Sequence, residues 1–138
     1  MQKIIFMRNR TKEYEALKIQ RKIWHLSGQC RQCGDKEIVK SHFCEKCYLI
    51  RVSAKRLGSG KYWRELKELL ENQKFKCALT GDKISFDNIE LDHILPTTRK
   101  GKSELSNVRW VTKDANRLKQ NLTDKELKIL CNKILLTI

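Results

Sequence analysis

The chain has 138 residues and a formal charge of +14, because 30 lysines and arginines face 16 aspartates and glutamates. This length allows one or two small domains with a modest core, and a hydrophobic content of 40% excludes a disordered tail. No apolar run approaches the roughly 18 residues of a membrane span. We therefore expect an intracellular, cytoplasmic protein whose charge favours nucleic acid as a partner over an anionic membrane surface.

Residues 11–26 carry apolar side chains at helical spacing and predict a helix that stops at Ser27 and Gly28. Two cysteine pairs follow, each with two intervening residues: Cys30 with Cys33, and Cys44 with Cys47. This spacing lets both thiolates of a pair reach one ion, and two pairs complete a tetrahedron for Zn²⁺. Disulfides and buried thiols are the alternatives, which a reducing compartment and polar neighbours disfavour, and His42 is a substitute ligand. We therefore predict a structural zinc site.

Residues 48–56 predict a short helix with a basic side formed by Arg51, Lys55 and Arg56. The glycine-rich break at residues 58–60 follows directly. We take this break as the boundary between a zinc-binding unit that contacts DNA, residues 1–57, and a second domain, residues 61–138.

The second half alternates helical and strand-like patterns. An apolar stripe predicts a helix up to about Gln73, and alternation predicts a strand over residues 89–95 that ends at Pro96. After a polar loop, residues 107–111 read as the returning strand and residues 112–120 as a short helix. Thr123 and Glu126 form a capping box that opens a last helix. Its expected inward residues are Leu127, Leu130, Cys131 and Ile134.

Asp92 and His93 are adjacent in an otherwise apolar stretch, where both side chains would be costly to bury without partners. Asn116 offers an amide oxygen one hairpin later. Two oxygen ligands with several retained waters suit Mg²⁺ or Mn²⁺, and a neutral histidine beside such a cation can take a proton from water. Taken alone, the Asp-His pair also fits a hydrogen-bonded structural pair, whereas the full set fits hydrolysis of a phosphodiester.

These segments resemble the HNH endonucleases, a family with a ββα-metal fold. Residues 91–96 are similar to the family's first strand with its catalytic dipeptide, residues 106–110 to its second strand, and residues 113–119 to its metal-binding helix. The resemblance implies that His93 is the general base and that Asn107 holds the histidine-bearing loop. It also implies that Asp92 and Asn116 are metal ligands, with Asn116 at a position where many members have histidine.

The family often has a further zinc-binding cysteine pair at the start of the module. Cys77 is present here, but Thr80 occupies the second position. We therefore expect no structural zinc in this half and a packing role for Cys77.

We expect an α+β protein in which a four-cysteine zinc unit with helices precedes a ββα-metal nuclease module flanked by helices. Its activity would be metal-dependent cleavage of double-stranded DNA, with Mg²⁺ or Mn²⁺ for catalysis and Zn²⁺ for structure. Candidate phosphate contacts are Arg51, Lys55, Arg56, Arg99, Lys100, Lys102, Arg109 and Arg117. One active site nicks one strand, so a double-strand break would require a homodimer or two events. The alternative is a noncatalytic zinc-containing nucleic-acid-binding module, and a phage or mobile element is a conceivable source of either.

Overall fold

The computed structural model describes the backbone of residues 2–138 and the side chains from Thr11 onward. The chain forms two compact units, one up to Leu49 and the other from Ile50 to Ile138. Helices and one two-stranded sheet give the mixed α+β class that the sequence predicted. Within the described residues, no helix has the length and apolar character needed to cross a membrane.

The first unit contains little apolar core. Helix α1 (Gln2–Leu26) confirms the helix predicted over residues 11–26, although its apolar side chains Ile19 and Ile23 are exposed. A loop leads to helix α2 (Glu45–Arg56), which begins three residues before the predicted helix and continues into the second unit. The buried cluster of this unit consists of Cys30, Cys44 and Cys47, with Phe43 packed against it.

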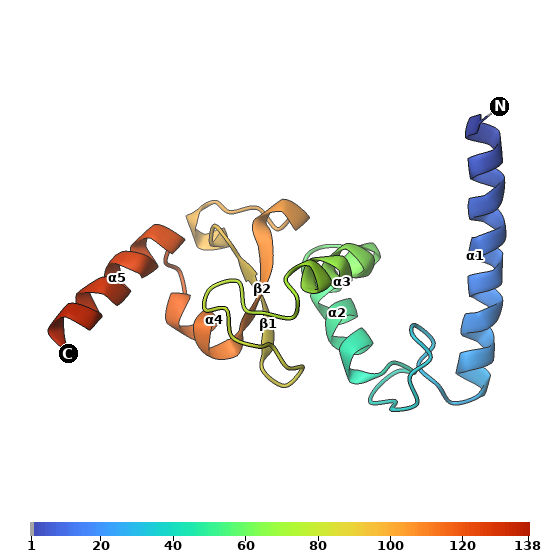
Figure 1. Ribbon diagram of the computed structural model, residues 1–138, viewed down its shortest axis with the longest axis horizontal. Helices are drawn as coiled ribbons and strands as arrows, with labels where there is room; N and C mark the ends of the chain where they lie inside the picture. The colour runs from blue at the N-terminus through green and yellow to red at the C-terminus, as the bar shows by residue number, and fades with distance from the viewer. Residues whose placement is uncertain (1) are drawn as a thin grey trace. The chain divides into compact units, whose positions relative to one another are not determined.

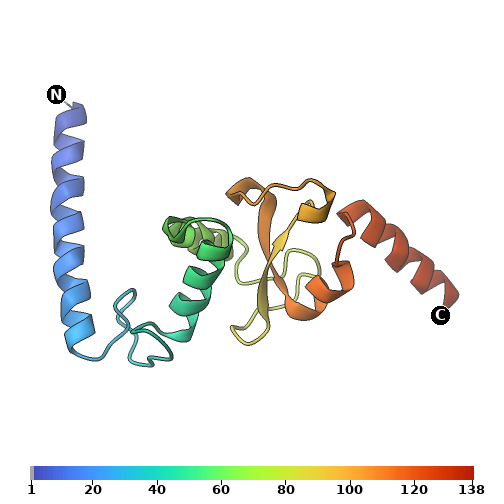
Figure 2. The same cartoon turned by 180° about the vertical axis from the view of Figure 1, so that it is seen from behind.

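The second unit is built around the antiparallel strands β1 (Ile89–His93) and β2 (Val108–Thr112), which lie side by side in Figures 1 and 2. Before them come the 3-10 turn η1 (Gly60–Tyr62) and helix α3 (Trp63–Asn72). Two further 3-10 turns, η2 (Thr97–Arg99) and η3 (Leu105–Asn107), lie between the strands, and helices α4 (Lys113–Lys119) and α5 (Asp124–Thr137) follow.

The core of this unit lies where α3 packs on β2. Leu66 and Leu70, one helical turn apart on α3, are fully buried, as is Val111 on β2. Trp110 is 1% exposed, and its indole N–H donates to the carbonyl of Leu66 at 2.8 Å. Burial of large apolar side chains therefore fixes β2, and through its pairing β1.

Helix α5 confirms the predicted capping box but corrects its predicted inward face. The Thr123 hydroxyl accepts from the Glu126 N–H and the Glu126 carboxylate accepts from the Thr123 N–H. Leu127 is buried, whereas Leu130 is 40% and Ile134 41% exposed. The prediction of a fully covered face was wrong because α5 leads away from the sheet after its first turns (Figure 1).

A tight turn at residues 77–82 precedes the strands. The Cys77 N–H donates to the Asp82 carbonyl at 2.7 Å, and the Gly81 N–H donates to the Cys77 carbonyl at 2.9 Å. Gly81 has φ +78°, which glycine adopts without a steric penalty. The Cys77 sulfur is buried and accepts a hydrogen bond from the Thr112 N–H at 3.3 Å, so this turn is tied to the end of β2.

Candidate active site

Strand β1 ends at the Asp-His dipeptide, and the sheet register fixes where each side chain lies. Asp92 pairs with Arg109 and His93 with Val108 on β2. Because successive side chains of a strand point to opposite faces, the two residues meet different surroundings. Asp92 is 5% exposed, whereas His93 is half-buried.

The buried Asp92 carboxylate is compensated by two cations. Arg109 Nε lies 3.0 Å from Oδ2, and Lys119 Nζ lies 2.9 Å from Oδ1. Lys119 Nζ also donates to the His93 carbonyl at 2.7 Å. These contacts offset the cost of removing a carboxylate from water, and they fix the backbone of the dipeptide to α4.

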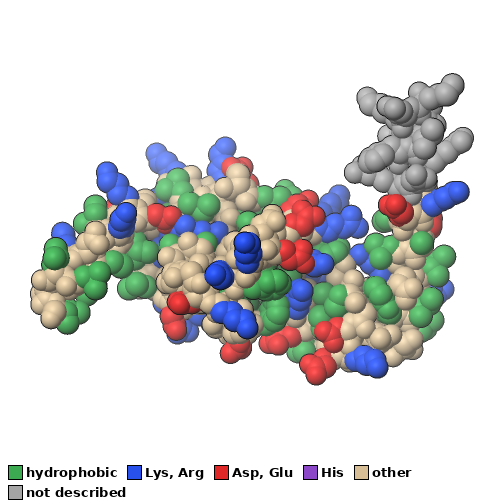
Figure 3. Space-filling model, in the orientation of Figure 1, with side chains coloured by type: hydrophobic (Ala, Val, Ile, Leu, Met, Phe, Trp, Pro, Cys, Tyr) green, Lys and Arg blue, Asp and Glu red, His purple; other side chains and the backbone are tan. Residues whose placement is uncertain are grey.

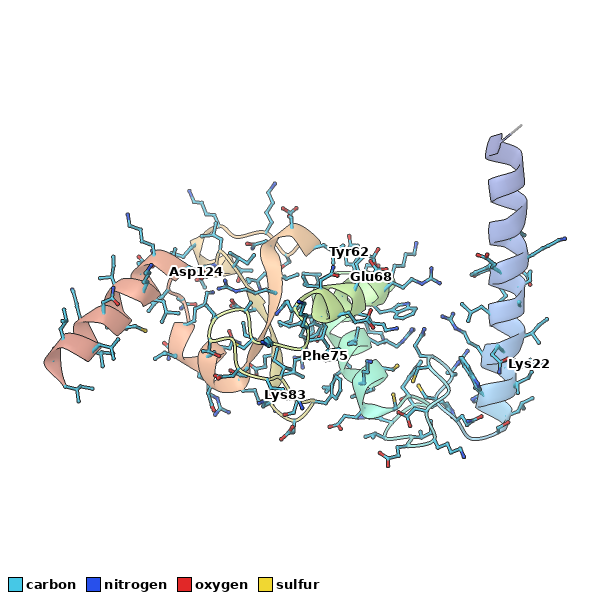
Figure 4. The ribbon with its side chains drawn as sticks, in the orientation of Figure 1. Lys22, Tyr62, Glu68, Phe75, Lys83 and Asp124 are labelled. Atoms are coloured by element: carbon cyan, nitrogen blue, oxygen red, sulfur yellow. The ribbon has the colours of Figure 1, made fainter. Side chains whose placement is uncertain are left out.

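Arg109 extends this network to the first residue of α5. Its guanidinium also binds both carboxylate oxygens of Asp124, which Figure 4 labels. Burial lowers the pKa of Arg109, but the hydrogen bonds that it donates to Asp124 and Asp92 outweigh burial and raise the pKa overall. The Arg109 hydrogen bond lowers the pKa of Asp124 below its ordinary value. Arg109 and Asp124 therefore stay ionised near neutral pH.

Asn107 clamps the loop that follows His93. Its side-chain oxygen accepts from the Leu95 N–H at 2.9 Å, and its amide nitrogen donates to the carbonyls of Leu95 and Lys102 at 3.0 and 2.9 Å. The loop folds tightly enough that a Cβ on Gly101 would lie 1.8 Å from the Leu95 carbonyl oxygen. This position therefore requires glycine, and one side chain holds both ends of the loop.

The imidazole of His93 contacts the same loop, because Nε2 lies 3.2 Å from the Ser103 hydroxyl oxygen. His93 also lines a mostly polar pocket of about 160 Å³. Asp92, Asn116 and Lys119 line this pocket as well, together with Leu91, Pro96, Thr97, Gln120 and Asn121. Three of the residues predicted from the sequence therefore border one space.

Asn116 has a defined orientation in this pocket. Its amide nitrogen donates to Glu90 Oε2 at 2.7 Å, so its carbonyl oxygen is the atom that it would offer to a cation. One carboxylate and one amide oxygen bordering a polar pocket fit a hard divalent cation that keeps several waters. The donor set therefore fits Mg²⁺ or Mn²⁺, although both oxygens of Asp92 already contact cationic side chains.

The basic residues predicted to contact phosphate occupy different environments. Four of them are exposed: Lys55, Arg56, Lys100 and Lys102. Arg99 is also exposed but pairs with Glu126 at 3.2 Å, and Arg117 lies 3.8 Å from Asp114. Arg51 on α2 is half-buried. On the face in Figure 3, basic side chains are spread over the second unit among acidic ones. Arg109 differs from the others because its side chain is 12% exposed and paired with two carboxylates.

The four predicted zinc ligands form a cluster in the first unit. The sulfurs of Cys30, Cys33, Cys44 and Cys47 all lie within 4.8 Å of one another, and all but Cys33 are buried. Burial and the neighbouring cysteines raise the pKa of Cys47. For Cys30, burial also acts upward, but backbone N–H donors outweigh it and lower the pKa to about 7. Four thiolates this close need a cation between them, so the cluster could hold Zn²⁺. His42 instead meets His25 edge to face, with ring centroids 4.3 Å apart.

Sequence reasoning missed four residues of the site: Glu90, Ser103, Lys119 and Asp124. A signal existed for two of them. Glu90 shares a strand face with Asp92 at a spacing of two residues, and Lys119 shares a helix face with Asn116 at a spacing of three. Ser103 and Asp124 contact the site only through the loop and the start of α5, which no periodicity reveals.

Comparison with known protein families gives a match to part of the chain. Residues 77–124 match the model described as HNH endonuclease. Searches of curated proteins and of solved structures found no match to the chain. The matched segment begins at the Cys77 turn, contains both strands and α4, and ends at Asp124. Residues 77–124 are therefore similar to HNH endonucleases.

Proposed function

We propose that the chain is a metal-dependent endonuclease that cleaves DNA at the pocket bordered by His93. The observation that carries this proposal is that Asp92, His93 and Asn116 border one polar pocket, while Asn107 clamps the loop beside it. The match of residues 77–124 to HNH endonucleases supports the same class of reaction.

In this reaction, His93 is the general base. Its imidazole takes a proton from a water molecule, whose oxygen attacks the phosphorus as the bond to the departing oxygen breaks. Asn107 acts as a positioning residue, because its three hydrogen bonds keep the loop from moving relative to the histidine. Asp92 and Asn116 would hold Mg²⁺ or Mn²⁺, which supplies charge stabilisation for the phosphate in the transition state.

DNA binding would depend on the exposed basic side chains of α2 and of the loop after β1. Lys55 and Arg56 end α2, and Lys100 and Lys102 lie between the strands. Phosphate contacts release counterions, so the affinity for duplex DNA should fall steeply with salt. Arg109 is a weaker candidate than these residues, because a phosphate would have to displace Asp92 or Asp124.

A single pocket can cut one strand at a time. We therefore expect a monomer to convert supercoiled plasmid into relaxed circles, and a double-strand break to need a second copy or a second event. The four cysteines would hold a structural Zn²⁺ that takes no part in the chemistry.

The test is plasmid relaxation by the full chain with Mg²⁺ or Mn²⁺. His93→Ala should abolish relaxation but leave DNA affinity, measured by gel shift, within about threefold, because a general base acts on the transition state. His25→Ala, an exposed histidine of α1, is the matched control and should cleave normally. DNA binding without cleavage in wild type would favour the noncatalytic module, and an equal loss of binding in His93→Ala would make the histidine structural.

A further inference from the structure

Lys119 is the most deeply buried cation in the described part of the chain. Its residue is 0% exposed, and its ammonium contacts Asp92 Oδ1 at 2.9 Å and the His93 carbonyl at 2.7 Å. An ammonium is removed from water only where partners of opposite polarity replace its hydration. The network in which it lies therefore depends on its charge.

The location of this ammonium coincides with the site proposed for a divalent cation. Lys119 lies three residues after Asn116 on α4, and both border the pocket with Asp92. The other carboxylate oxygen of Asp92 accepts a hydrogen bond from Arg109, whose guanidinium also donates to Asp124. Of the two cations on Asp92, only Lys119 borders the pocket. A metal ion that enters the pocket would therefore meet Lys119.

We propose that Lys119 competes with the divalent cation for Asp92. In the metal-free protein its ammonium neutralises the carboxylate and holds the Asp-His dipeptide in place. Binding of the metal ion at Asp92 displaces the ammonium from Oδ1, since two cations on the pocket side of one carboxylate repel each other. The lysine thereby lowers the metal affinity of the site, and this inference rests on the proposed role of Asp92 as a ligand.

The first test measures metal affinity without DNA. Mn²⁺ is titrated into the zinc-loaded full chain, and free Mn²⁺ is followed by electron paramagnetic resonance. Lys119→Met should bind Mn²⁺ about tenfold more tightly than wild type, within the usual range of coupling between two ligands. Lys113→Met is the matched control, because it removes the same charge from the same helix at a lysine that binds the Asp87 carbonyl, and it should change the affinity less than twofold.

Asp92→Asn separates this inference from the proposed function. In that background Lys119→Met should no longer change the affinity. If Asp92→Asn binds Mn²⁺ as wild type does, the ligand assignment and the competition both fail. If Asp92→Asn weakens binding but Lys119→Met leaves it unchanged or weaker, the competition alone is wrong.

A second measurement needs no variant and remains informative if Lys119→Met does not fold. An amine-reactive acetylating reagent followed by mass spectrometry reports how accessible each lysine is. Lys119 should be protected without divalent cation and should react severalfold faster with saturating Mn²⁺, relative to Lys113 in the same sample. Equal protection in both conditions would contradict displacement of the ammonium.

Discussion

Residues 30–35 and residues 77–82 fold into the same turn, although the first carries two cysteines and the second a cysteine and a threonine. In each turn the N–H of the first residue donates to the carbonyl of the sixth at 2.7 Å. The fifth residue donates back to the first at 2.8 Å in one turn and 2.9 Å in the other. That fifth residue is Gly34 or Gly81, with φ +79° and +78°.

The correspondence extends to the segments that face the two turns. Cys44 directly precedes α2 and Thr112 directly precedes α4. The backbone N–H of each reaches the first cysteine of its turn: that of Cys44 helps to lower the pKa of Cys30, and that of Thr112 donates to the Cys77 sulfur. The positions Cys30, Cys33, Cys44 and Cys47 therefore match Cys77, Thr80, Thr112 and Ala115.

The two sites differ in what holds them together. Burial raises the pKa of Cys77, but a hydrogen bond from Thr80 and backbone N–H donors outweigh it and lower the pKa to about 7. The second unit also has a buried apolar core that includes Leu66 and Trp110. In the first unit, the buried cluster is made of the cysteines themselves. The first unit therefore combines this turn with four clustered cysteines that could hold Zn²⁺, whereas the second unit combines it with one buried cysteine and an apolar core.

The largest expected effect is the loss of zinc from the first unit. Cys47→Ser should release the zinc and unfold residues up to about Leu49, because the free energy of binding structural zinc, roughly 10 kcal/mol or more, is free energy of folding. Elemental analysis and far-ultraviolet circular dichroism measure the two losses. Cys77→Ser is the matched control and should keep one zinc per chain. A loss of zinc in this control would place the metal in the second unit.

An intermediate effect is expected from placing thiols in the second unit, at the three positions that correspond to Cys33, Cys44 and Cys47 of the first unit. If the correspondence is correct, the triple variant Thr80→Cys, Thr112→Cys and Ala115→Cys should bind a second zinc ion with tetrahedral sulfur coordination. X-ray absorption at the zinc edge and the zinc content per chain provide the readout. Thr80→Cys alone should keep one zinc, since two thiols do not close a structural site. If the triple variant binds only one zinc ion per chain, the four positions in the second unit differ in geometry from the four cysteines of the first unit.

The smallest expected effect concerns the ion pair between Asp124 and Arg109 in the second unit. Folding lowers the pKa of Asp124, so the pair stabilises the protein fully above the unfolded pKa of about 3.9, and this contribution is lost as pH falls through the lower folded value. The Asp124 side chain is 48% exposed, so screening limits the contribution to about 1 kcal/mol or less. Urea unfolding should show Asp124→Asn less stable than wild type at pH 7 and equal to it near pH 2. A difference that persists at low pH would contradict this assignment.

Much of the fold could be predicted from local patterns in the sequence. The stripe containing Leu66 and Leu70 gave α3, the alternation before Pro96 gave β1, and the capping box gave the start of α5. The inward face of α5 was wrong, because periodicity identifies an apolar side but not whether another element covers it.

For the candidate site too, some residues could be predicted from the sequence and others could not. Asp92 and His93 could be selected because polar groups in an apolar segment need an explanation. Asn116 could be selected because it offers an amide oxygen one hairpin later, and Asn107 followed only from the resemblance to HNH endonucleases. The pairing of Arg109 and Lys119 with Asp92 could not be predicted, because only the strand register and the packing of α4 bring these two cations to the carboxylate. Ion pairs between distant residues leave no local pattern.

The proposed contrast between a structural zinc ion in the first unit and an exchangeable catalytic ion in the second unit can be tested in a single sample. The full chain is treated briefly with EDTA, and plasmid relaxation and zinc content are then measured together. The account predicts that relaxation is lost and returns with Mg²⁺ or Mn²⁺, while one zinc per chain remains, because buried thiolates hold zinc tightly and an open oxygen site exchanges freely. Relaxation that persists after EDTA, or that is lost only together with the zinc, would contradict it.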